Sequence, residues 1–371
     1  MTTDFGRGTL PYCSFVGHEE KHPRVGVGVG TDVLDLTAAA ARIVPDRAAL
    51  FAVGTLDALL AAGPAVWDEV RTALASWIDD PAAARHLVPA ADVDLAMPFA
   101  VADYVDFYAS EHHAKNVGRL FRPNAEPLLP NWRHLPVGYH GRAGTVVVSG
   151  TPIHRPRGQT GEGRFGPTAK LDLEAEVGFV VGTASRRGEA VSVDDVEQHL
   201  FGICLVNDWS ARDIQAWEYV PLGPFLGKSF ATSISPWIVP LAALAAARVA
   251  PPQQHPEPLD YLRAEHPWTL DLDLTVSING TVVSRPPFAS TYWTPAQMLA
   301  HLTVNGASLR TGDLFASGTV SGPDADQRGS LLELNDDAGY LADGDVVTIA
   351  ATARLADGQH IQLGEVVGRV H

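Results

Sequence analysis

The segment that decides the fold reads Leu171-Asp-Leu-Glu-Ala-Glu-Val-Gly-Phe-Val-Val181. Polar and apolar residues alternate in its first half, which is the period of an extended strand, and its second half is almost wholly apolar. Apolar flanks of this kind are typical of a strand inside a sheet. Because side chains two residues apart share one face of a strand, Glu174 and Glu176 project together, away from the apolar residues between them. We therefore expect a buried strand that carries two carboxylates on one face.

Two neighbouring carboxylates repel each other unless water solvates them or a cation bridges them. An isolated Glu-x-Glu is usually a solvated outer face of a sheet, but the apolar flanks argue against that interpretation here. Two further acidic residues lie among aromatic side chains: Asp106, in Asp103-Tyr-Val-Asp-Phe-Tyr108, and Asp208, in Val206-Asn-Asp-Trp209. Four carboxylates on buried segments fit a hard divalent ion such as Ca²⁺ or Mg²⁺. The Cys and His spacing does not indicate a structural zinc site.

Strand patterns continue on both sides of this segment and predict a mainly β (α+β) fold. Asn279-Gly280 stands between two alternating runs, which is a strong signal for a two-residue hairpin turn. One helix is indicated after Thr294, an N-cap residue followed by proline, with Gln297 completing a capping box. The other expected strands are Thr145–Val148, Leu270–Ile278, Thr281–Ser284, Asp313–Val320 and Asp345–Leu355.

The N-terminal part of the chain has a different pattern. Val25–Gly30 alternates and Val33–Leu36 returns after a turn, which predicts a hairpin. Its glycines do not match a dinucleotide fingerprint, because Thr31 stands where the third glycine belongs. Residues 38–88 are rich in Ala and Leu with a helical period, and Val88–Pro98 indicates a linker. We therefore expect two domains, residues 1–98 and 99–371.

The composition excludes several classes of protein. A length of 371 residues suits two domains, and 34 glycines with 27 prolines favour many turns and few long helices. The net charge is −16 and no run of Lys and Arg occurs, so we expect no nucleic-acid partner. Two cysteines exclude a disulfide framework and suit a reducing compartment. Without a signal peptide or membrane-spanning segment, we expect a soluble cytoplasmic protein that binds no membrane.

A second segment dense in polar and aromatic residues runs from Asp208 to Thr232. Gly227-Lys-Ser229 resembles the end of a phosphate loop, but only three residues separate it from Gly223 where four are required. We expect instead a loop shaped by Gly and Pro that presents donors to an anionic substrate. The expected donors are Arg212, Gln215, Tyr219 and Lys228. Neither a Gly-x-Ser-x-Gly elbow nor a recognisable cysteine motif supports covalent catalysis.

Taken together, these segments resemble the fumarylacetoacetate hydrolase family in its full-length, two-domain form. The resemblance covers essentially the whole chain, beginning with Leu10-Pro-Tyr12. It is carried by Asp106–Gly118, Leu135-Pro-Val-Gly-Tyr-His-Gly-Arg142, Leu171-Asp-Leu-Glu-Ala-Glu176, Asn207-Asp-Trp-Ser-Ala-Arg-Asp-Ile-Gln215, Trp217–Phe230 and Ala316-Ser-Gly-Thr-Val-Ser-Gly-Pro323. One departure is His301-Leu302, where the family more often has paired histidines, and the segment after Glu333 is short.

The resemblance implies a small SH3-like N-terminal β-barrel domain, a larger β-sandwich-roll catalytic domain with a few helices, and a homodimer. The implied activity is metal-dependent hydrolysis of the carbon–carbon bond of 4-fumarylacetoacetate to fumarate and acetoacetate, the last step of tyrosine and phenylalanine (homogentisate) catabolism. The substrate is therefore expected to be a small dicarboxylic diketone.

The resemblance also implies a role for each site residue. His113 matches the proton acceptor and Glu333 the carboxylate that orients it, while Lys228 and Thr232 align with positions near a second, structural Mg²⁺. The ligands of the catalytic ion, Ca²⁺ or Mg²⁺, are expected to be Asp106, Glu174, Glu176 and Asp208. The residues that match substrate-contacting positions are Tyr108, Arg122, Tyr139, Gln215, Tyr219 and Thr319.

The chemistry of this reaction agrees with these residue types. Cleaving a carbon–carbon bond requires stabilisation of a carbanion, and a divalent ion that polarises both oxygens of a 1,3-diketone lets that group depart as an enolate. His113, oriented by Glu333, would deprotonate water near neutral pH. The developing negative charge would be stabilised by Arg212, Gln215 and Lys228.

Three other functions stay open. The chain could hydrolyse or decarboxylate another β-diketo or 2-oxo acid, isomerise a related enol acid, or serve as a non-catalytic metal-binding scaffold. Arg122, Tyr139 and Thr319 match the fumarylacetoacetate pattern, with Arg122 suited to a substrate carboxylate. His113 and Glu333 would be redundant in an isomerase and in a scaffold.

Overall fold

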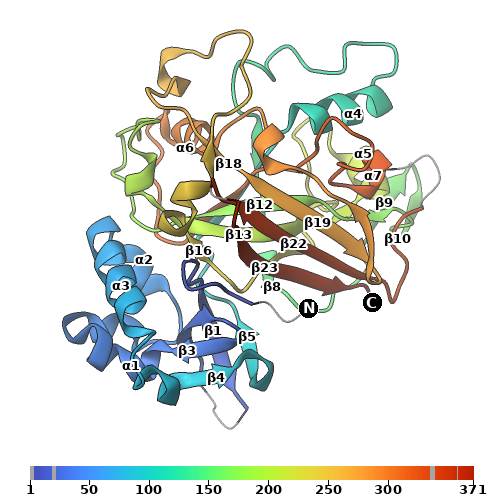
Figure 1. Cartoon of the computed structure of the whole chain (residues 1–371). Helices are drawn as coiled ribbons and strands as arrows, with labels where there is room; N and C mark the ends of the chain where they lie inside the picture. The colour runs from blue at the N-terminus through green and yellow to red at the C-terminus, as the bar shows by residue number, and fades with distance from the viewer. Residues whose placement is uncertain (1–3, 19–21, 335–338, 357) are drawn as a thin grey trace.

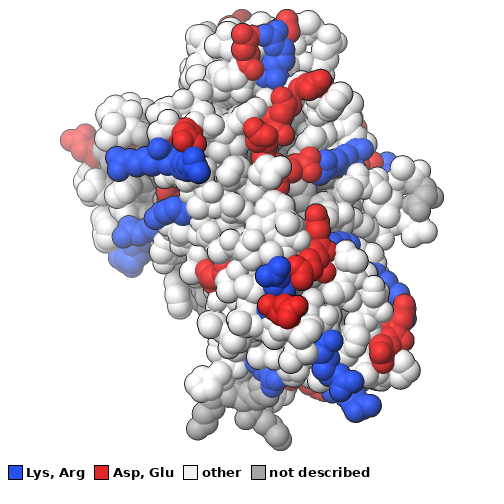
Figure 2. Space-filling view, turned by 90° about the vertical axis from the view of Figure 1, so that its left-hand side faces the viewer, with Lys and Arg blue, Asp and Glu red and all other residues white. Residues whose placement is uncertain are grey.

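The computed structural model describes residues 4–18, 22–334, 339–356 and 358–371. Figure 1 shows a small N-terminal body beside a larger body rich in strands. The mainly β fold expected from the sequence is confirmed. None of the helices within these residues is both long and apolar enough to span a bilayer. On the face in Figure 2, acidic and basic side chains are mixed, and the described residues there form no broad basic area.

The N-terminal body is a five-stranded antiparallel sheet covered by three helices (Figure 1). Its strands, in sheet order, are β4 (Leu87–Pro89), β3 (Asp32–Asp35), β2 (Arg24–Val29), β1 (Tyr12–Gly17) and β5 (Val93–Ala96). Its helices are α1 (Leu36–Ile43), α2 (Asp57–Ala61) and α3 (Pro64–Trp77). The hairpin expected at residues 25–36 is confirmed, since β2 pairs with β3.

The prediction of a linker at Val88–Pro98 is wrong, because most of this segment belongs to a sheet. Leu95 pairs with Phe15 of β1, and Val88 pairs with Val33 of β3. The prolines that mark the segment fall at strand ends, where a missing N–H costs no ladder hydrogen bond. The two bodies also share a core across their junction, where Tyr12 exchanges backbone hydrogen bonds of 2.9 and 2.8 Å with Ile238. The division at residue 98 therefore stays a prediction.

The larger body is built on an eight-stranded mixed sheet. In sheet order its strands are β7 (Gly138–His140), β6 (Asp103–Phe107), β21 (Asp313–Ala316), β12 (Ala175–Val181), β13 (Leu200–Asp208), β15 (Thr232–Ile234) and β8 (Val146–Val148), with β16 (Val239–Pro240) paired to β13. The interior strand expected from the sequence is β12, which pairs with both β13 and β21.

Three expected strands are interrupted or end early in the structure. The strand expected at residues 270–278 is broken at Asp271, between β18 (Thr269–Leu270) and β19 (Leu272–Ile278). The strand expected at residues 171–181 is interrupted between β11 (Leu171–Asp172) and β12. The Asp172 and Asn207 side chains accept from the N–H groups of Leu173 and Glu174, so side chains there replace the ladder. The strand expected at 313–320 ends at Ala316, because Gly318 turns the chain with φ +74° where a Cβ would meet the Phe107 carbonyl.

A four-stranded antiparallel sheet packs against the eight-stranded one (Figure 1). Its strands are β20 (Thr281–Ser284), β19 (Leu272–Ile278), β22 (Val346–Arg354) and β23 (His360–Arg369). Asn279 and Gly280 both have positive φ, 51° and 79°, as the predicted two-residue hairpin turn requires. The predicted helix is α6 (Pro295–Thr303), and both hydrogen bonds of its capping box are present.

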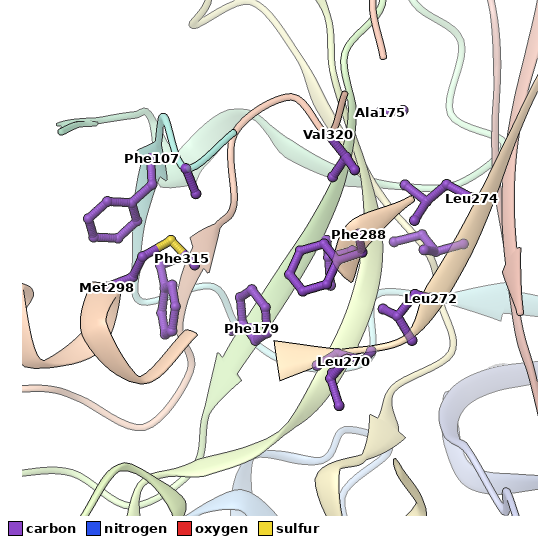
Figure 3. Close-up of a cluster of buried hydrophobic side chains, with 14 of the residues drawn as sticks. Phe107, Ala175, Phe179, Leu270, Leu272, Leu274, Phe288, Met298, Phe315 and Val320 are labelled. Atoms are coloured by element: carbon purple, nitrogen blue, oxygen red, sulfur yellow. The ribbon is translucent and has the colours of Figure 1, made fainter. Parts of the chain in front are cut away.

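The core between these two sheets fixes β12 in place (Figure 3). Phe179 of β12 stacks on Phe315 of β21 with 5.1 Å between ring centroids. Leu272 and Leu274 of β19 reach the same cluster from the other sheet. Each fully buried large apolar side chain contributes about 1.5–3 kcal/mol, so β12 is a rigid platform for the side chains it carries.

The remaining elements are short and join or cover the sheets. The helices among them are α4 (Glu111–Phe121), α5 (Arg212–Glu218) and α7 (Leu331–Leu334). The strands are β9 (Arg157–Gly161), β10 (Arg164–Pro167), β14 (Ser210–Ala211), β17 (Arg248–Val249) and β18 (Thr269–Leu270). The helices α4, α5 and α7 carry His113, Arg212 and Glu333, respectively.

Candidate active site

A cavity of about 430 Å³ lies at the end of the eight-stranded sheet, between α4 and α5. Its deep end is polar and its rim is apolar, with Phe121, Leu129 and Leu222 at the mouth. All six residues expected to contact substrate lie on its wall, namely Tyr108, Arg122, Tyr139, Gln215, Tyr219 and Thr319. Segments that are far apart in the sequence thus meet at one place.

Four carboxylates meet at the deep end of the cavity. Asp106 lies on β6, Glu174 just before β12, Glu176 on β12, and Asp208 at the end of β13. All four side chains are buried, and one oxygen of each lies within 4.8 Å of the others. The two glutamates expected to share a face therefore do converge, although the strand is interrupted between them.

Three oxygens of this acidic cluster have no hydrogen-bond partner among the described residues. They are both carboxylate oxygens of Glu176 and Oδ1 of Asp106. A buried carboxylate without a partner is costly unless a cation lies beside it. Oxygens that lie within 4.8 Å of one another are close enough to share one divalent ion. The residues present therefore fit a divalent ion.

The ionisation of the cluster reflects the same crowding. Burial, with repulsion from neighbouring carboxylates, raises the pKa of Asp106 and of Glu176 well above their ordinary values. Burial also raises the pKa of Asp208. Glu174 behaves differently: burial opposes its ionisation, but the charges of Arg212 and Lys228 outweigh that effect and lower its pKa. Without a further cation, the negative charge of the cluster is only partly compensated.

Two buried cations lie between this cluster and the cavity. Lys228 Nζ donates to Glu174 and, at 2.6 Å, to Asp208 Oδ2. Arg212 donates from Nη2 to Glu174 Oε1 at 2.7 Å and from Nη1 to Gln215 Oε1 at 3.1 Å. Neighbouring carboxylates raise the pKa of both cations against the effect of burial. Both side chains therefore stay charged at neutral pH.

The prediction that a loop carries all four donors is wrong for Arg212 and Gln215. Arg212 and Gln215 lie on α5, because the residues from Arg212 to Glu218 include no glycine or proline. The Gly and Pro residues begin after Val220, so only the second half, with Lys228, is a loop. The helix fixes Arg212 and Gln215 three residues apart on one face, which points both toward the cavity.

Asp208 is also held by two hydroxyl groups. Thr232 Oγ1 donates to Asp208 Oδ1 at 2.9 Å, and the Tyr139 hydroxyl donates to Oδ2 at 3.1 Å. Thr232 is thus next to the cluster, as its expected place near a metal site requires. The Thr319 hydroxyl is buried at the cavity wall without a partner in the described chain, so it is free to contact a ligand.

His113, on α4, lines the same cavity and lies beside Glu174 of the acidic cluster. Its Nδ1 is 2.6 Å from Glu333 Oε2, and its Nε2 is 4.0 Å from Glu174 Oε1. Because a carboxylate accepts at Nδ1, we assign the proton to that nitrogen, which leaves the Nε2 lone pair facing the cavity. Tyr108 packs edge-on against the ring, with 5.2 Å between centroids.

Glu333 has a partner at each oxygen. Asn116 Nδ2 donates to Oε1 at 2.9 Å, while the hydroxyls of Ser321 and Ser330 each donate to Oε2 at 2.9 Å. Burial opposes ionisation of this carboxylate, but His113 and the hydrogen bonds outweigh it and lower the pKa of Glu333. The carboxylate therefore stays charged and can hold His113 in one orientation.

Arg122 lies at the end of α4, on the cavity wall. Its Nη2 donates to the Pro127 carbonyl at 2.6 Å, which leaves other guanidinium N–H groups for a ligand. The nearby rings of Phe121 and Tyr219 are 6.5 Å apart and link α4 to the segment after α5. The mouth thus combines one cation with aromatic and aliphatic side chains.

No sequence pattern marks Asp172, Asn116, Ser321 or Ser330 as site residues. The hydrogen bond from Asn116 to Glu333 spans 217 residues, and a single polar residue carries no spacing that reveals such a contact. The short segment after Glu333 includes residues 335–338, which lie outside the described residues. Leu302, the other departure, packs against the main core.

Both parts of the chain match family models. Residues 8–98 match "Fumarylacetoacetase N-terminal" and residues 103–371 match "Fumarylacetoacetate (FAA) hydrolase C-terminal". The fumarylacetoacetase of Rattus norvegicus is 42% identical over 99% of this chain and 96% of its own length. The human and Caenorhabditis elegans fumarylacetoacetases are each 41% identical, over 99% and 100% of this chain and 96% and 97% of their own.

Solved structures share the fold at lower identity. A fumarylacetoacetate hydrolase from psychrophilic Exiguobacterium antarcticum superposes with a TM-score of 0.62 at 18% identity, covering 97% of this chain and 99% of its own. A maleylpyruvate hydrolase from Sphingobium superposes with a TM-score of 0.55 at 18% identity, covering 97% and 98%. The full-length sequence matches are much stronger, and they show that the chain belongs to the fumarylacetoacetate hydrolase family in its two-domain form.

Proposed function

We propose that this chain hydrolyses fumarylacetoacetate to fumarate and acetoacetate with the help of a divalent ion. The observation that carries the proposal is the arrangement of the cavity, where an acidic cluster with unpartnered oxygens faces a histidine held by a buried carboxylate. The full-length identity to proteins named fumarylacetoacetase supports the choice of substrate.

The acidic cluster is proposed to hold the catalytic ion through Asp106, Glu174, Glu176 and Asp208. Such an ion, when bound, supplies a Lewis acid that polarises the oxygens of the diketone. Four clustered carboxylates suit either Ca²⁺ or Mg²⁺, since both are hard cations that prefer oxygen ligands.

A second, structural Mg²⁺ is proposed near Thr232 and Lys228. The Lys228 ammonium has no lone pair and already donates to two carboxylates, so it cannot be a ligand. Any contact from Lys228 to this ion therefore falls to its backbone carbonyl. The Thr232 hydroxyl beside Asp208 is the side chain that supports the proposal.

His113 is proposed as the general base. Glu333 holds the ring through Nδ1, so Nε2 can accept a proton from a water molecule in the cavity. The resulting hydroxide would attack the carbonyl beside the alkene. The hydrogen bonds at both oxygens of Glu333 keep the ring from turning away.

Arg212, Gln215 and Lys228 are proposed to stabilise the negative charge that develops on the substrate oxygens. Arg212 and Lys228 are fixed in place by carboxylates before substrate arrives, so little reorganisation is needed at the moment of reaction. Arg122 is proposed to bind a carboxylate of the substrate. Tyr108, Tyr139, Tyr219 and Thr319 would form the rest of the substrate wall.

We further propose that the chain acts as a homodimer in the cytoplasm. The homodimer rests on the family to which the chain belongs. The compartment is supported by Cys13 and Cys204, which are both buried and free. Sedimentation of the purified protein would test the dimer directly.

The experiment that tests the proposed function follows the loss of fumarylacetoacetate absorbance with purified protein, before and after EDTA and with Ca²⁺ or Mg²⁺ restored. Cleavage to fumarate that stops with EDTA and returns with the ion is the expected result. Cleavage of simpler acylpyruvates alone would change the substrate assignment. A failure to cleave any diketone would contradict the proposed activity.

A further inference from the structure

Asp172 is a fully buried carboxylate outside the acidic cluster, and its oxygens accept four hydrogen bonds. Oδ1 accepts from the backbone N–H groups of Leu173 at 2.7 Å and Leu331 at 2.8 Å. Oδ2 accepts from Arg212 Nε at 2.8 Å and from the N–H of Leu332 at 3.0 Å. The four donors use the acceptor capacity of an ionised carboxylate fully.

These four contacts join two sides of the candidate active site. Arg212, bound through Nε, uses its other nitrogens to hold Glu174 and Gln215. Leu331 and Leu332 begin α7, the helix turn that carries Glu333 and therefore orients His113. A single side chain thus contacts the element behind the proposed base and the cation beside the acidic cluster.

We propose that Asp172 is a positioning residue that holds Arg212 and the Glu333-bearing turn in fixed register across the cavity. It does not touch the cavity itself, so its effect passes through those two groups. The inference rests on the proposed function for its effect on turnover, although the positioning itself can be measured without substrate.

The arrangement requires a carboxylate at this position. All four partners are N–H donors, and an amide side chain would turn its own NH₂ toward two of them. The negative charge also faces the Arg212 guanidinium in a buried place, where an unpaired cation would be costly. Asp172→Asn keeps the shape of the side chain and removes both features.

Asp213 offers a matched control on the same helix as Arg212. Its carboxylate also binds a neighbouring segment, accepting from Thr168 Oγ1 and from the N–H of Ala169 at 2.9 Å. Its carboxylate makes no hydrogen bond to the Arg212 side chain or to α7 in the described structure. Asp213→Asn therefore weakens a comparable set of hydrogen bonds but leaves those that Asp172 makes to Arg212 and α7.

The experiment compares the full-length wild type, Asp172→Asn and Asp213→Asn by hydrogen–deuterium exchange and by steady-state kinetics on fumarylacetoacetate. In Asp172→Asn we expect faster exchange in peptides that cover Ser330–Leu334, and a kcat about 10–100-fold lower with KM changed by less than about threefold. In Asp213→Asn both quantities should stay near the wild-type values. A merely structural role would lower the melting temperature while leaving kcat per folded molecule unchanged.

Unchanged exchange at Ser330–Leu334 in a folded Asp172→Asn protein would overturn the proposal, whatever the activity. Changed exchange in a protein whose wild type cleaves no fumarylacetoacetate would instead overturn the proposed function and leave the positioning intact. If Asp172→Asn does not fold, Asp172→Glu, which keeps the charge, is measured in the same way. Loss of folding in both variants, with Asp213→Asn folded, would contradict a positioning role in favour of a structural one.

Discussion

The two polar halves of the cavity differ in how many of their buried carboxylate oxygens have a hydrogen-bond partner. On one side, Glu333 has hydrogen bonds at both oxygens and holds His113 through Nδ1. On the other side, both oxygens of Glu176 and one of Asp106 are buried without a partner in the described chain. The histidine side is complete without a cation, whereas the acidic cluster is not.

The acidic cluster depends on positive charge beyond that of the described residues. The pKa of Glu333 is lowered, so its charge is stabilised by the fold, while the pKa of Glu176 is raised well above its ordinary value. A divalent ion would remove the difference by neutralising the cluster. Changes on the two sides should therefore separate turnover from ion binding.

The largest expected effect comes from His113→Ala. Loss of a general base costs about 10²–10⁴-fold in rate, so kcat should fall by that order. Affinity for Ca²⁺ should stay nearly unchanged, because the four ligands are untouched. His112→Ala is the matched control, since His112 lies outside the cavity wall, and it should keep most of the activity. Full activity in the His113→Ala protein would contradict the mechanism.

Glu176→Gln should lower the affinity for the ion, which His113→Ala leaves unchanged. Removing one charge from the ligand set should weaken Ca²⁺ binding about tenfold or more, as measured by calorimetric titration. Activity should be partly recovered by raising the Ca²⁺ concentration, which cannot rescue His113→Ala. Glu197→Gln, at a surface ion pair with Arg248, serves as the control. Equal Ca²⁺ affinity in Glu176→Gln and wild type would show that Glu176 is not a ligand of the ion.

Stability of the metal-stripped protein should depend on pH because of the acidic cluster. The folded-state pKa values of Asp106, Glu176 and Asp208 are raised, so the folded form keeps protons that the unfolded chain releases above about pH 4. The free energy of unfolding should therefore fall as pH rises from about 4 through these raised values. Glu174, whose pKa is lowered, acts in the opposite direction and only at lower pH.

Melting curves measured with and without Ca²⁺ test this prediction. The metal-stripped wild type should melt several degrees lower at pH 7 than at pH 5, and saturating Ca²⁺ should reduce that fall. Metal-stripped Glu176→Gln should show a smaller fall than wild type, since one of the crowded carboxylates is gone. A melting temperature that rises over this range in the stripped protein would show that the cluster is compensated without an ion.

The smallest expected effect comes from Ser330→Ala. Glu333 would lose one of its donors and keep three, so the cost should be about 0.5–1.5 kcal/mol in stability. Turnover should fall only severalfold and Ca²⁺ affinity should not change. Chemical denaturation and steady-state kinetics measure both quantities. A loss as large as that of His113→Ala would mean that Glu333 is not held by several independent bonds.

The features that the sequence predicted well are those with a local pattern. The capping box at Thr294, the turn at Asn279-Gly280 and the interior strand carrying Glu176 each follow from neighbouring residues. The break at Glu174 and the strand ending at Ala316 could not be predicted, because a side chain from β13 and a close approach to Phe107 cause them.

The candidate site also has features that follow from a local sequence pattern and features that depend on distant contacts. Carboxylates on buried segments indicated a cation site before any fold was known, because their charge makes burial costly without a partner. The hydrogen bonds of Asp172 to Arg212 and to the start of α7 span 40 and up to 160 residues of chain. Such contacts depend on how the sheets bring distant segments together, and no spacing in the sequence records them.

The most direct test of the account measures divalent-ion binding by the metal-stripped wild type, using calorimetric titration of Ca²⁺ and then Mg²⁺. We expect saturable binding of Ca²⁺ or Mg²⁺, with at least one ion per chain, and much weaker binding in Glu176→Gln. A stripped protein that binds neither ion and still cleaves fumarylacetoacetate at its full rate would contradict it.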